Sequence, residues 1–123
     1  MIYLTPEDIV NLNARHLGGT AAVRDAGLVA SSAGRPSSGM FGTDAYPTME
    51  LKAAALLHSL ICNHGFVDGN KRTAWSAMEI MLWINGRYFS ALSEDEAFEL
   101  VHLVATDSEM GVEKIAEALR IES

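Results

Sequence analysis

Two apolar segments of helical length, separated by a short polar link, constrain this chain most strongly. The first begins after Thr48, a residue suited to capping a helix, and continues to about Asn63. The second runs from about Asn70 to Asn85, where Gly86 provides a C-terminal stop. The first segment is apolar on nearly all sides, and the second is also rich in apolar residues, so both are expected to be central. A polar link held at both ends by such helices is a common place for functional residues.

Helix signals also mark four shorter segments. The first begins at Pro6, after the cap Thr5, and ends at the Gly18-Gly19 pair, and the second covers Ala26–Ala33 after the cap Asp25. The third begins at the capping box of Ser93 and Glu96, and the fourth covers about Val112–Arg120. The three glycines and two prolines of residues 34–47 predict a loop, with room for a short hairpin. No segment alternates apolar and polar residues as a sustained strand does. We therefore predict an all-α fold of about six helices around two central apolar helices.

The length and charge of the chain bound its organisation. With 123 residues, of which 49% are hydrophobic and 20% charged, it supports one compact domain spanning residues 1–123. The net charge is −7, and residues 93–123, with nine acidic and two basic residues, account for all of it. Such a chain is not expected to bind nucleic acid directly or an anionic membrane surface. Residues 1–92 balance seven basic against seven acidic residues, so a locally positive site can form there.

Nothing in the sequence indicates export or membrane insertion. Cys62 is the single cysteine, which excludes an intrachain disulfide. The first residues lack the basic region and apolar run of a signal peptide. The apolar stretch Ala53–Cys62 is interrupted by His58 and is far shorter than the roughly 20 residues that cross a bilayer. We expect a soluble, cytoplasmic protein.

The link between the two apolar helices is dense in polar groups. It reads His64-Gly65-Phe66-Val67-Asp68-Gly69-Asn70-Lys71-Arg72-Thr73, and its last residues form the first turn of the second helix. Unpaired N–H groups and the positive end of the helix dipole attract phosphate to such a turn. Gly69 would let the backbone come close to an anion. Lys71 and Arg72 are unfavourable at this end for the helix alone, and a bound polyphosphate would reverse that penalty.

Each of these residues also has a simpler interpretation. His64 could cap the C-terminus of the first helix, and Asp68 could cap the N-terminus of the second. Lys71 and Arg72 could belong to a solvated face. Together, these interpretations do not explain two cations in the first turn beside a carboxylate and an imidazole. Phe66 is most simply an apolar anchor that pins the link to the core.

Other residues near the link are predicted to be structural. His58, Cys62 and His64 are close in sequence but match no closed zinc pattern, so a buried cysteine and a hydrogen-bonded histidine are favoured over a metal site. Glu79 is expected to face solvent or to form a salt bridge. The Met and Trp residues at positions 75, 78, 81 and 83 are predicted to pack in the core.

The link resembles the signature of the Fic/Doc family, and specifically of its Doc (death-on-curing) toxin branch. The Fic signature reads His-Pro-Phe-x-Asp/Glu-Gly-Asn-Gly-Arg-x-x-Arg, which residues 64–75 follow with three departures. Lys71 stands where Fic enzymes have their last Gly, as in the Doc branch, which also has Thr-Ala after the arginine. Further Doc-like pieces occur in the same order along the chain: Gly18-Gly19, Val23-Arg24-Asp25, Gly27-Leu28, Arg35-Pro36, Phe41-Gly42, Tyr46-Pro47 and Lys52-Ala53-Ala54. The resemblance covers roughly residues 3–120.

The resemblance implies an all-α Fic/Doc fold and a toxin of a toxin–antitoxin pair. Such a toxin moves the γ-phosphate of ATP, with Mg²⁺, to a Thr or Ser hydroxyl of elongation factor Tu, which arrests translation, and a Phd-type antitoxin blocks it. By position, the catalytic residues would be His64 as general base, Asp68 as the Mg²⁺ ligand, and Lys71. The nucleotide phosphates would be held by Gly69, Asn70, Lys71 and Arg72.

The three departures from the Fic signature bear on the reaction. Gly65 replaces Pro, which is expected to loosen the link. Trp75 replaces the second arginine and so removes one phosphate clamp, while Lys71 puts a long cation where AMP transfer needs bare backbone. These changes favour phosphate transfer over the alternative, AMP transfer by a Fic-type adenylyltransferase. A second alternative is a non-catalytic module that acts only by binding a partner.

Overall fold

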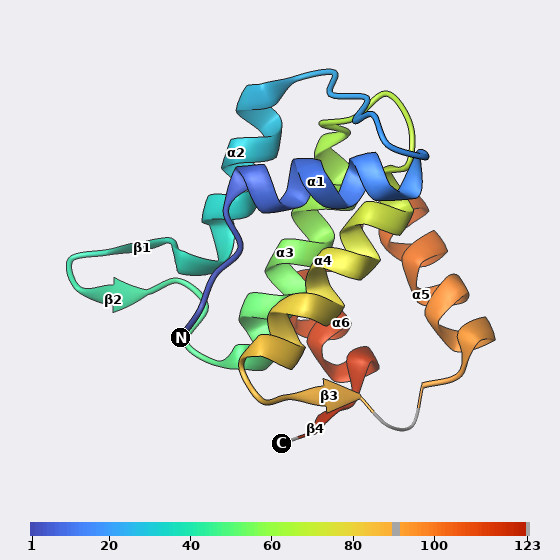
Figure 1. The fold of residues 1–123 in the computed structure, drawn as a ribbon. Coiled ribbons are helices and arrows are strands. Elements are labelled where there is room, and N and C mark those ends of the chain that lie inside the picture. Colours follow the sequence, from blue (N-terminus) through green and yellow to red (C-terminus); the bar gives the residue numbers. More distant parts are fainter. Residues whose placement is uncertain (90–91, 123) are drawn as a thin grey trace.

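Six α-helices make up most of the residues described by the structure, a computed structural model that covers residues 1–89 and 92–122. They are α1 (Pro6–His16), α2 (Ala26–Gly34), α3 (Met49–Asn63), α4 (Asn70–Ile84), α5 (Glu94–Thr106) and α6 (Val112–Leu119). A 3-10 helix, η1 (Arg35–Ser37), follows α2 directly. Four short strands complete the described part: β1 (Gly39–Met40), β2 (Thr43–Asp44), β3 (Tyr88–Phe89) and β4 (Ile121–Glu122). The predicted all-α fold is confirmed (Figure 1).

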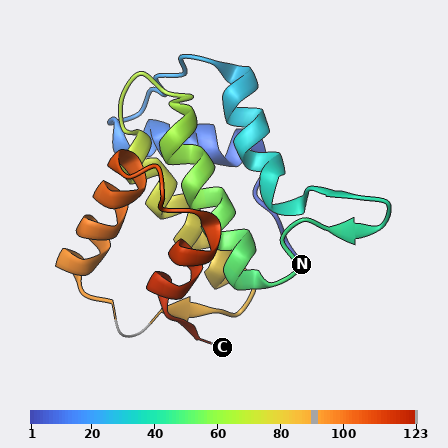
Figure 2. The same ribbon diagram turned by 180° about the vertical axis from the view of Figure 1, so that it is seen from behind.

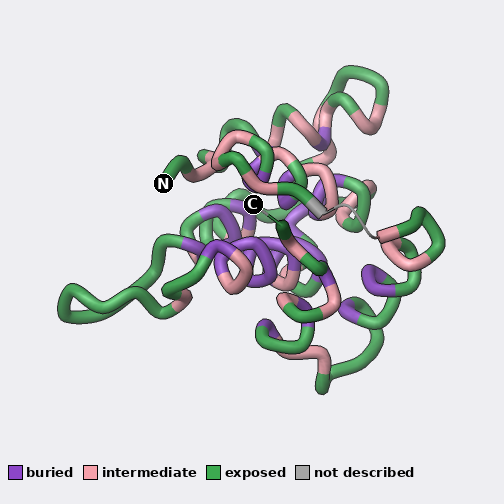
Figure 3. Tube along the Cα trace, turned by 90° about the horizontal axis from the view of Figure 1, so that it is seen from below, coloured by how far each residue is buried: buried purple, intermediate pink, exposed green. Residues whose placement is uncertain are grey.

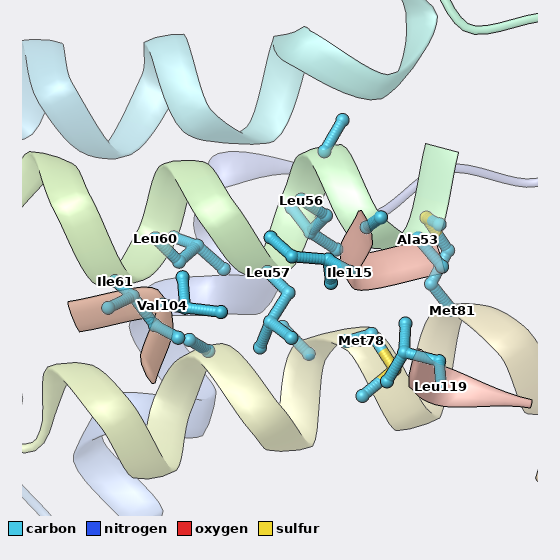
Figure 4. Packing of buried hydrophobic residues seen from close by; sticks show 14 of the residues in the cluster. Ala53, Leu56, Leu57, Leu60, Ile61, Met78, Met81, Val104, Ile115 and Leu119 are labelled. Atoms are coloured by element: carbon cyan, nitrogen blue, oxygen red, sulfur yellow. The ribbon is translucent and has the colours of Figure 1, made fainter. Parts of the chain in front are cut away.

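Helices α3 and α4 lie side by side at the centre of the molecule, as predicted (Figures 1 and 2). Ten of the 15 residues of α3 are buried, and Figure 3 shows the buried positions gathered along the middle of the fold. Helices α2 and α6 pack on α3, and α1 packs on α4. Figure 4 shows side chains from three of these helices meeting in the core, among them Leu57, Met78 and Ile115. Burying one such side chain stabilises the fold by about 1.5–3 kcal/mol, so this packing dominates its stability.

Capping side chains determine where several helices begin. Thr5 and Asp8 form a reciprocal box at α1, in which each backbone N–H donates to the other residue's side chain, at 2.9 and 3.1 Å. Ser93 and Glu96 form the predicted box at α5. The pKa of the Glu96 carboxyl lies below its ordinary value, chiefly because the Ser93 backbone N–H donates to it and, to a smaller extent, because the Ser93 side chain does. The predicted single caps of α2 and α3 are also present, at Asp25 and Thr48.

The tryptophans of α4 correct one prediction. Met78 and Met81 are buried, and Trp75 is partly buried against the core, as expected. Trp83, however, is 77% exposed, so its predicted place in the core is wrong. The buried apolar residues of α4, at positions 74, 77, 78, 81 and 82, recur at helical spacing on one face. Trp83 falls beyond the edge of that face, because each residue turns the helix by about 100°.

The short strands were the least predictable elements. Strands β3 and β4 pair antiparallel, with Tyr88 opposite Glu122 and Phe89 opposite Ile121, and so join the segment after α4 to the end of α6 (Figure 1). Two residues are too few to leave an alternating pattern in the sequence. Strands β1 and β2 form the hairpin for which the loop of residues 34–47 left room. None of the described helices has the length and apolar character needed to cross a bilayer.

The hairpin of β1 and β2 projects from the body of the molecule and is anchored at its base (Figures 1 and 2). Lys52 of α3 is only 3% exposed, yet its Nζ donates to the Pro36 carbonyl at 3.2 Å and to Asp44 Oδ2 at 3.4 Å. A buried ammonium group needs such partners, because losing water without them costs several kcal/mol. The buried lysine therefore ties the hairpin to the central helix.

A second cation holds the same base. Nε of Arg35 donates to the Tyr46 hydroxyl, and Nη1 donates to Ser59 Oγ and to Nδ1 of His58, each at 2.8 Å. Because arginine can only donate, Nδ1 of His58 must be its unprotonated, accepting nitrogen. Partial burial, followed by the charge of Arg35, lowers the pKa of His58 from its ordinary value of 6.5. The hydrogen-bonded histidine predicted from the sequence is therefore present.

This histidine predicts a pH dependence of stability. Between pH 6.5 and its lowered pKa, the unfolded chain binds more protons at His58 than the folded chain, so stability falls as the pH falls through that window. Replacing His58→Gln keeps an acceptor for Arg35 and removes the titration. Urea unfolding between pH 7 and pH 5 should show a steeper loss of stability in the wild type than in His58→Gln. Equal slopes would contradict this assignment.

Candidate functional site

The six residues predicted to form the site line one small cavity. Its volume is about 310 Å³, and it opens where α3 ends and α4 begins. Its wall includes all six: His64, Asp68, Gly69, Asn70, Lys71 and Arg72. The remaining lining residues are Ile61, Val67 and Ala105, the last of which belongs to α5. The six residues between the two packed helices, together with the first turn of α4, therefore bring an imidazole, a carboxylate and two cations to the same opening.

His64 both ends α3 and lines the cavity. It is the C-cap of the helix, with φ 52° and ψ 50°, in the left-handed region that costs a non-glycine residue about 1–2 kcal/mol. Arg24 compensates for this turn by donating Nε to the His64 carbonyl at 2.6 Å and Nη2 to the Asn63 carbonyl at 3.2 Å. The His64 ring itself makes no hydrogen bond to residues 1–89 or 92–122. Strained backbone of this kind recurs at functional sites, where neighbouring contacts hold it in place.

Gly65 lets the link pack directly on α2. A Cβ at this position would lie 2.7 Å from Cγ2 of Val29 and 3.3 Å from its backbone nitrogen. The Gly65 carbonyl also accepts the backbone N–H groups of Arg24 and Asp25, at 2.8 and 3.0 Å. The glycine was expected to loosen the link, but the structure shows a buried, doubly hydrogen-bonded position instead.

Phe66 and Asn70 close the link on itself. The Phe66 ring is 2% exposed, which confirms its prediction as a core anchor. The Asn70 side chain accepts the Phe66 N–H at 3.1 Å and donates to the Phe66 carbonyl at 2.8 Å. Because the amide is used in this way, Asn70 would meet a phosphate through its backbone N–H. The first backbone bond of α4 is donated by Thr73, so the N–H groups before it have no acceptor within the helix.

Asp68 is not the cap of α4. That position is taken by Gly69, with φ 76°, and no side chain caps the helix. Oδ1 of Asp68 accepts the N–H of Gly69 at 2.7 Å, and the carboxylate lies exposed on the cavity wall. Within the described ranges, no cation forms an ion pair with Asp68. The simpler interpretation of Asp68 is therefore not observed, and its carboxylate is available to a ligand.

Lys71 and Arg72 stand exposed in the first turn of α4, which has no acidic residue. Neither forms an ion pair with another part of the chain that the structure describes. By contrast, α1 and α5 carry two and three acidic residues in their first turns. The N-terminus of α4 is thus a cationic end whose charge the described protein groups do not neutralise, and it is suited to a phosphate.

A larger groove lies beside this cavity and shares its two cations. It measures about 720 Å³ and runs between α4 and α5, with Phe98 on its wall. A third hollow of about 690 Å³, between α1 and α4, includes Glu79, Trp83 and Tyr88. Glu79 is exposed, as predicted, although partial burial raises the pKa of its carboxyl. Both larger hollows border His16 and Ser76, whose side chains are hydrogen-bonded at 2.7 Å.

The candidate metal set of His58, Cys62 and His64 does not assemble. No group of three or more His, Cys, Asp or Glu residues that could hold a metal occurs among the residues described. His58 is engaged with Arg35, as the sequence interpretation favoured. Cys62, predicted to be buried, is instead exposed, with Sγ 3.7 Å from the Val104 carbonyl. Partial burial nevertheless raises the pKa of the Cys62 thiol, against a smaller opposing effect of Arg35.

Sequence reasoning missed two residues that shape the site. Arg24 holds the carbonyls at the end of α3, and Asn13 of α1, which is fully buried, bonds to the Asp68 carbonyl. Both form hydrogen bonds with residues far away in the sequence, so no local sequence pattern predicts these contacts. The only available signal for Asn13 was an amide on the apolar side of a helix, beside Ile9 and Leu12.

Comparisons with known proteins agree with this geometry. The model of the Fic/DOC family matches residues 3–82. A curated protein of Mycolicibacterium smegmatis named Toxin Doc is 47% identical to this chain over 105 residues. The match covers 85% of this chain and 81% of that protein, so it extends beyond the link to most of the fold.

Tight packing at Gly65 predicts the cost of a single methyl group. Gly65→Ala should lower the free energy of unfolding by about 1–3 kcal/mol, because Val29 or the start of α2 must move. Gly34→Ala in α2 is the matched control, since a Cβ there meets nothing within 4 Å. Urea denaturation of both variants provides the comparison. Equal stabilities of the two variants would show that the link is not packed as described.

Proposed function

Because the chain belongs to the Fic/DOC family, we propose that it is the toxin of a toxin–antitoxin pair. We propose further that it acts as a protein kinase, moving the γ-phosphate of ATP to a Thr or Ser hydroxyl. The acceptor we propose is a translation factor like elongation factor Tu, whose modification arrests translation in the cytoplasm. The single observation that carries this proposal is the cavity in which His64, Asp68 and the cationic start of α4 meet.

The proposed reaction uses these groups in distinct roles. The His64 ring makes no hydrogen bond to the described residues, so it can take the proton from the acceptor hydroxyl while the hydroxyl oxygen bonds to the γ-phosphorus. The bond between that phosphorus and the bridging oxygen breaks, and ADP leaves. Lys71, Arg72 and the N–H groups of α4 stabilise the negative charge on the transferring group. Phosphoryl transfer depends chiefly on such positioning and charge stabilisation.

The donor set at Asp68 fits Mg²⁺. An exposed carboxylate with no cation partner in the described ranges is a hard oxygen ligand of the kind that Mg²⁺ prefers. The ion usually binds through one or two carboxylates together with substrate phosphates and water, so a second protein ligand is not required. When bound, it would neutralise phosphate charge. Asp68 would hold it, and the Gly69 N–H orients that carboxylate.

Two residues near the start of α4 support phosphate transfer rather than AMP transfer. Lys71 places a long cation on the cavity wall, where adenylyl transfer by Fic enzymes needs bare backbone. At position 75, a partly buried Trp replaces the second arginine of the Fic signature. AMP transfer to the same acceptor is the alternative reaction.

Mass spectrometry of the acceptor tests the reaction. Elongation factor Tu incubated with the protein, ATP and Mg²⁺ should gain about 80 Da, whereas AMP transfer would add about 329 Da. His64→Ala should reduce the transfer by about 10²–10⁴-fold, as expected for loss of a general base. Asp68→Ala should reduce it as well.

His58→Gln is the matched control, because His58 lies outside the cavity. It should transfer phosphate like the wild type. Full activity of a folded His64→Ala protein would exclude His64 as the base. If the active wild type produced no mass change on any acceptor and arrested growth regardless of position 64, the non-catalytic module would be the correct interpretation.

The partner proposed to restrain this toxin is a Phd-type antitoxin. We propose that it presents an amphipathic helix that folds on binding and covers apolar groups next to the site. Trp83 and Phe98 are each 77% exposed and lie in the two larger hollows on either side of His16 and Ser76. Both are large, exposed aromatic side chains that such a helix could bury.

Calorimetry with the product of the neighbouring reading frame tests this contact. Trp83→Ala and Phe98→Ala should each weaken binding by at least about tenfold, as expected for buried aromatic anchors. Phe41→Ala is the control, since Phe41 is 98% exposed on the distant hairpin. Unchanged affinity in both groove variants would place the partner elsewhere.

A further inference from the structure

We propose that Asn13 of α1 is a positioning residue for the Asp68 carboxylate. The proposal rests on the proposed function, since it gives Asp68 a ligand-binding role. Asn13 lies outside the link and does not line the cavity. It would act through the backbone of the link, by holding the peptide group whose other end orients the carboxylate.

The Asn13 side chain is wholly buried and uses each of its polar atoms. Nδ2 donates to the Asp68 carbonyl at 3.0 Å and to Thr73 Oγ1 at 3.1 Å. Oδ1 accepts the backbone N–H of Ala22 at 2.9 Å. A buried amide satisfied on both donors and on its acceptor has a single favourable orientation, because a flip would place donors against the Ala22 N–H. The Asn13 side chain therefore has one fixed position and orientation in the core.

The peptide group between Asp68 and Gly69 transmits this position. Its carbonyl oxygen is held by Asn13, and its N–H donates to Oδ1 of Asp68 at 2.7 Å. A peptide group is planar, so holding the oxygen also sets the direction of the N–H. The N–H then fixes the carboxylate at the cavity wall. Gly69 permits this arrangement, because its φ of 76° is one that other residues adopt only with strain.

Further hydrogen bonds connect Asn13 to the residue that precedes Asp68 and so complete a ring. The Val67 N–H donates to the Ala22 carbonyl at 2.7 Å, and the Ala22 N–H donates to Asn13. The ring runs from Asn13 to Ala22, to Val67, along the chain to Asp68, and back to Asn13. Asn13 is buried and Ala22 half-buried, whereas Val67 and Asp68 are exposed. The ring thus holds the backbone rigid while leaving the carboxylate open to a ligand.

Two variants of the same buried cluster separate positioning from stability. Asn13→Ala releases the Asp68 carbonyl, whereas Thr73→Val replaces the hydroxyl with a methyl group and leaves the bond from Asn13 to Asp68 in place. Both should destabilise the fold. Asn13→Ala should lower kcat by about 10²-fold and raise the Mg²⁺ concentration for half-maximal rate. Thr73→Val should keep kcat within about threefold of the wild type.

A binding measurement provides a readout independent of turnover. Calorimetry with Mg²⁺ and a non-hydrolysable ATP analogue should show weaker binding to Asn13→Ala than to Thr73→Val. Equal kcat and equal affinity in the two folded variants would overturn the proposal. If Asn13→Ala does not fold, nuclear magnetic resonance of the wild type decides. Mg²⁺ with the analogue should shift the Gly69 amide and the Asn13 side-chain amide with one midpoint, and a shift at Gly69 alone would overturn it.

These results also distinguish a failure of the proposed function from a failure of the role of Asn13. A wild-type protein that binds the analogue but transfers no phosphate would refute the proposed function, while the titration would still report on Asn13. An active wild type with an equally active, folded Asn13→Ala variant would refute only the role of Asn13.

Discussion

The packing of α3 against α4 is the constraint on which the rest of the structure depends. Both helices bury long apolar faces, so neither can slide or rotate without exposing side chains such as Leu57 or Met78. Their ends are therefore fixed, and the six residues between them must turn within a short distance. The turn requires left-handed backbone at Gly69, which a glycine adopts readily, and at His64, where a side chain makes it unfavourable. Arg24, Asn13 and Asn70 supply the hydrogen bonds that make it stable.

The helices of the fold differ in the charges that their first turns carry. Helices α1 and α5 have stabilising N-termini, with acidic first turns that favour the helix dipole and with reciprocal capping boxes. Helix α4 departs from them, since it begins with a glycine, has no side-chain cap and carries Lys71 and Arg72 in its first turn. The tight packing of α4 on its neighbours compensates for this unfavourable start. A helix end that is electrostatically incomplete in this way is a physical reason to expect an anionic ligand.

Local signals were sufficient to predict most of the fold. Caps at Thr5, Asp25, Thr48 and Ser93 mark helix starts because their bonds are made within three residues along the chain. The residues predicted for the site line one cavity, because all of them lie within nine positions of one another along the chain. The exposed Trp83, the pairing of β3 with β4, and the contacts of Arg24 and Asn13 were beyond reach. The strand pairing and the contacts of Arg24 with His64 and of Asn13 with Asp68 join residues 32 or more positions apart. The exposure of Trp83 depends on which helix face is buried, and only tertiary packing determines either feature.

The missing Cβ at Gly65 also has a consequence for how sequences of this family can vary. The space that a side chain would need there is already filled by Val29, so the two positions share one volume across the start of α2. Relatives that carry the proline of the Fic signature at this point must accommodate a ring in that volume. Positions 29 and 65 should therefore co-vary, with a smaller residue than valine, or a displaced second helix, accompanying every proline.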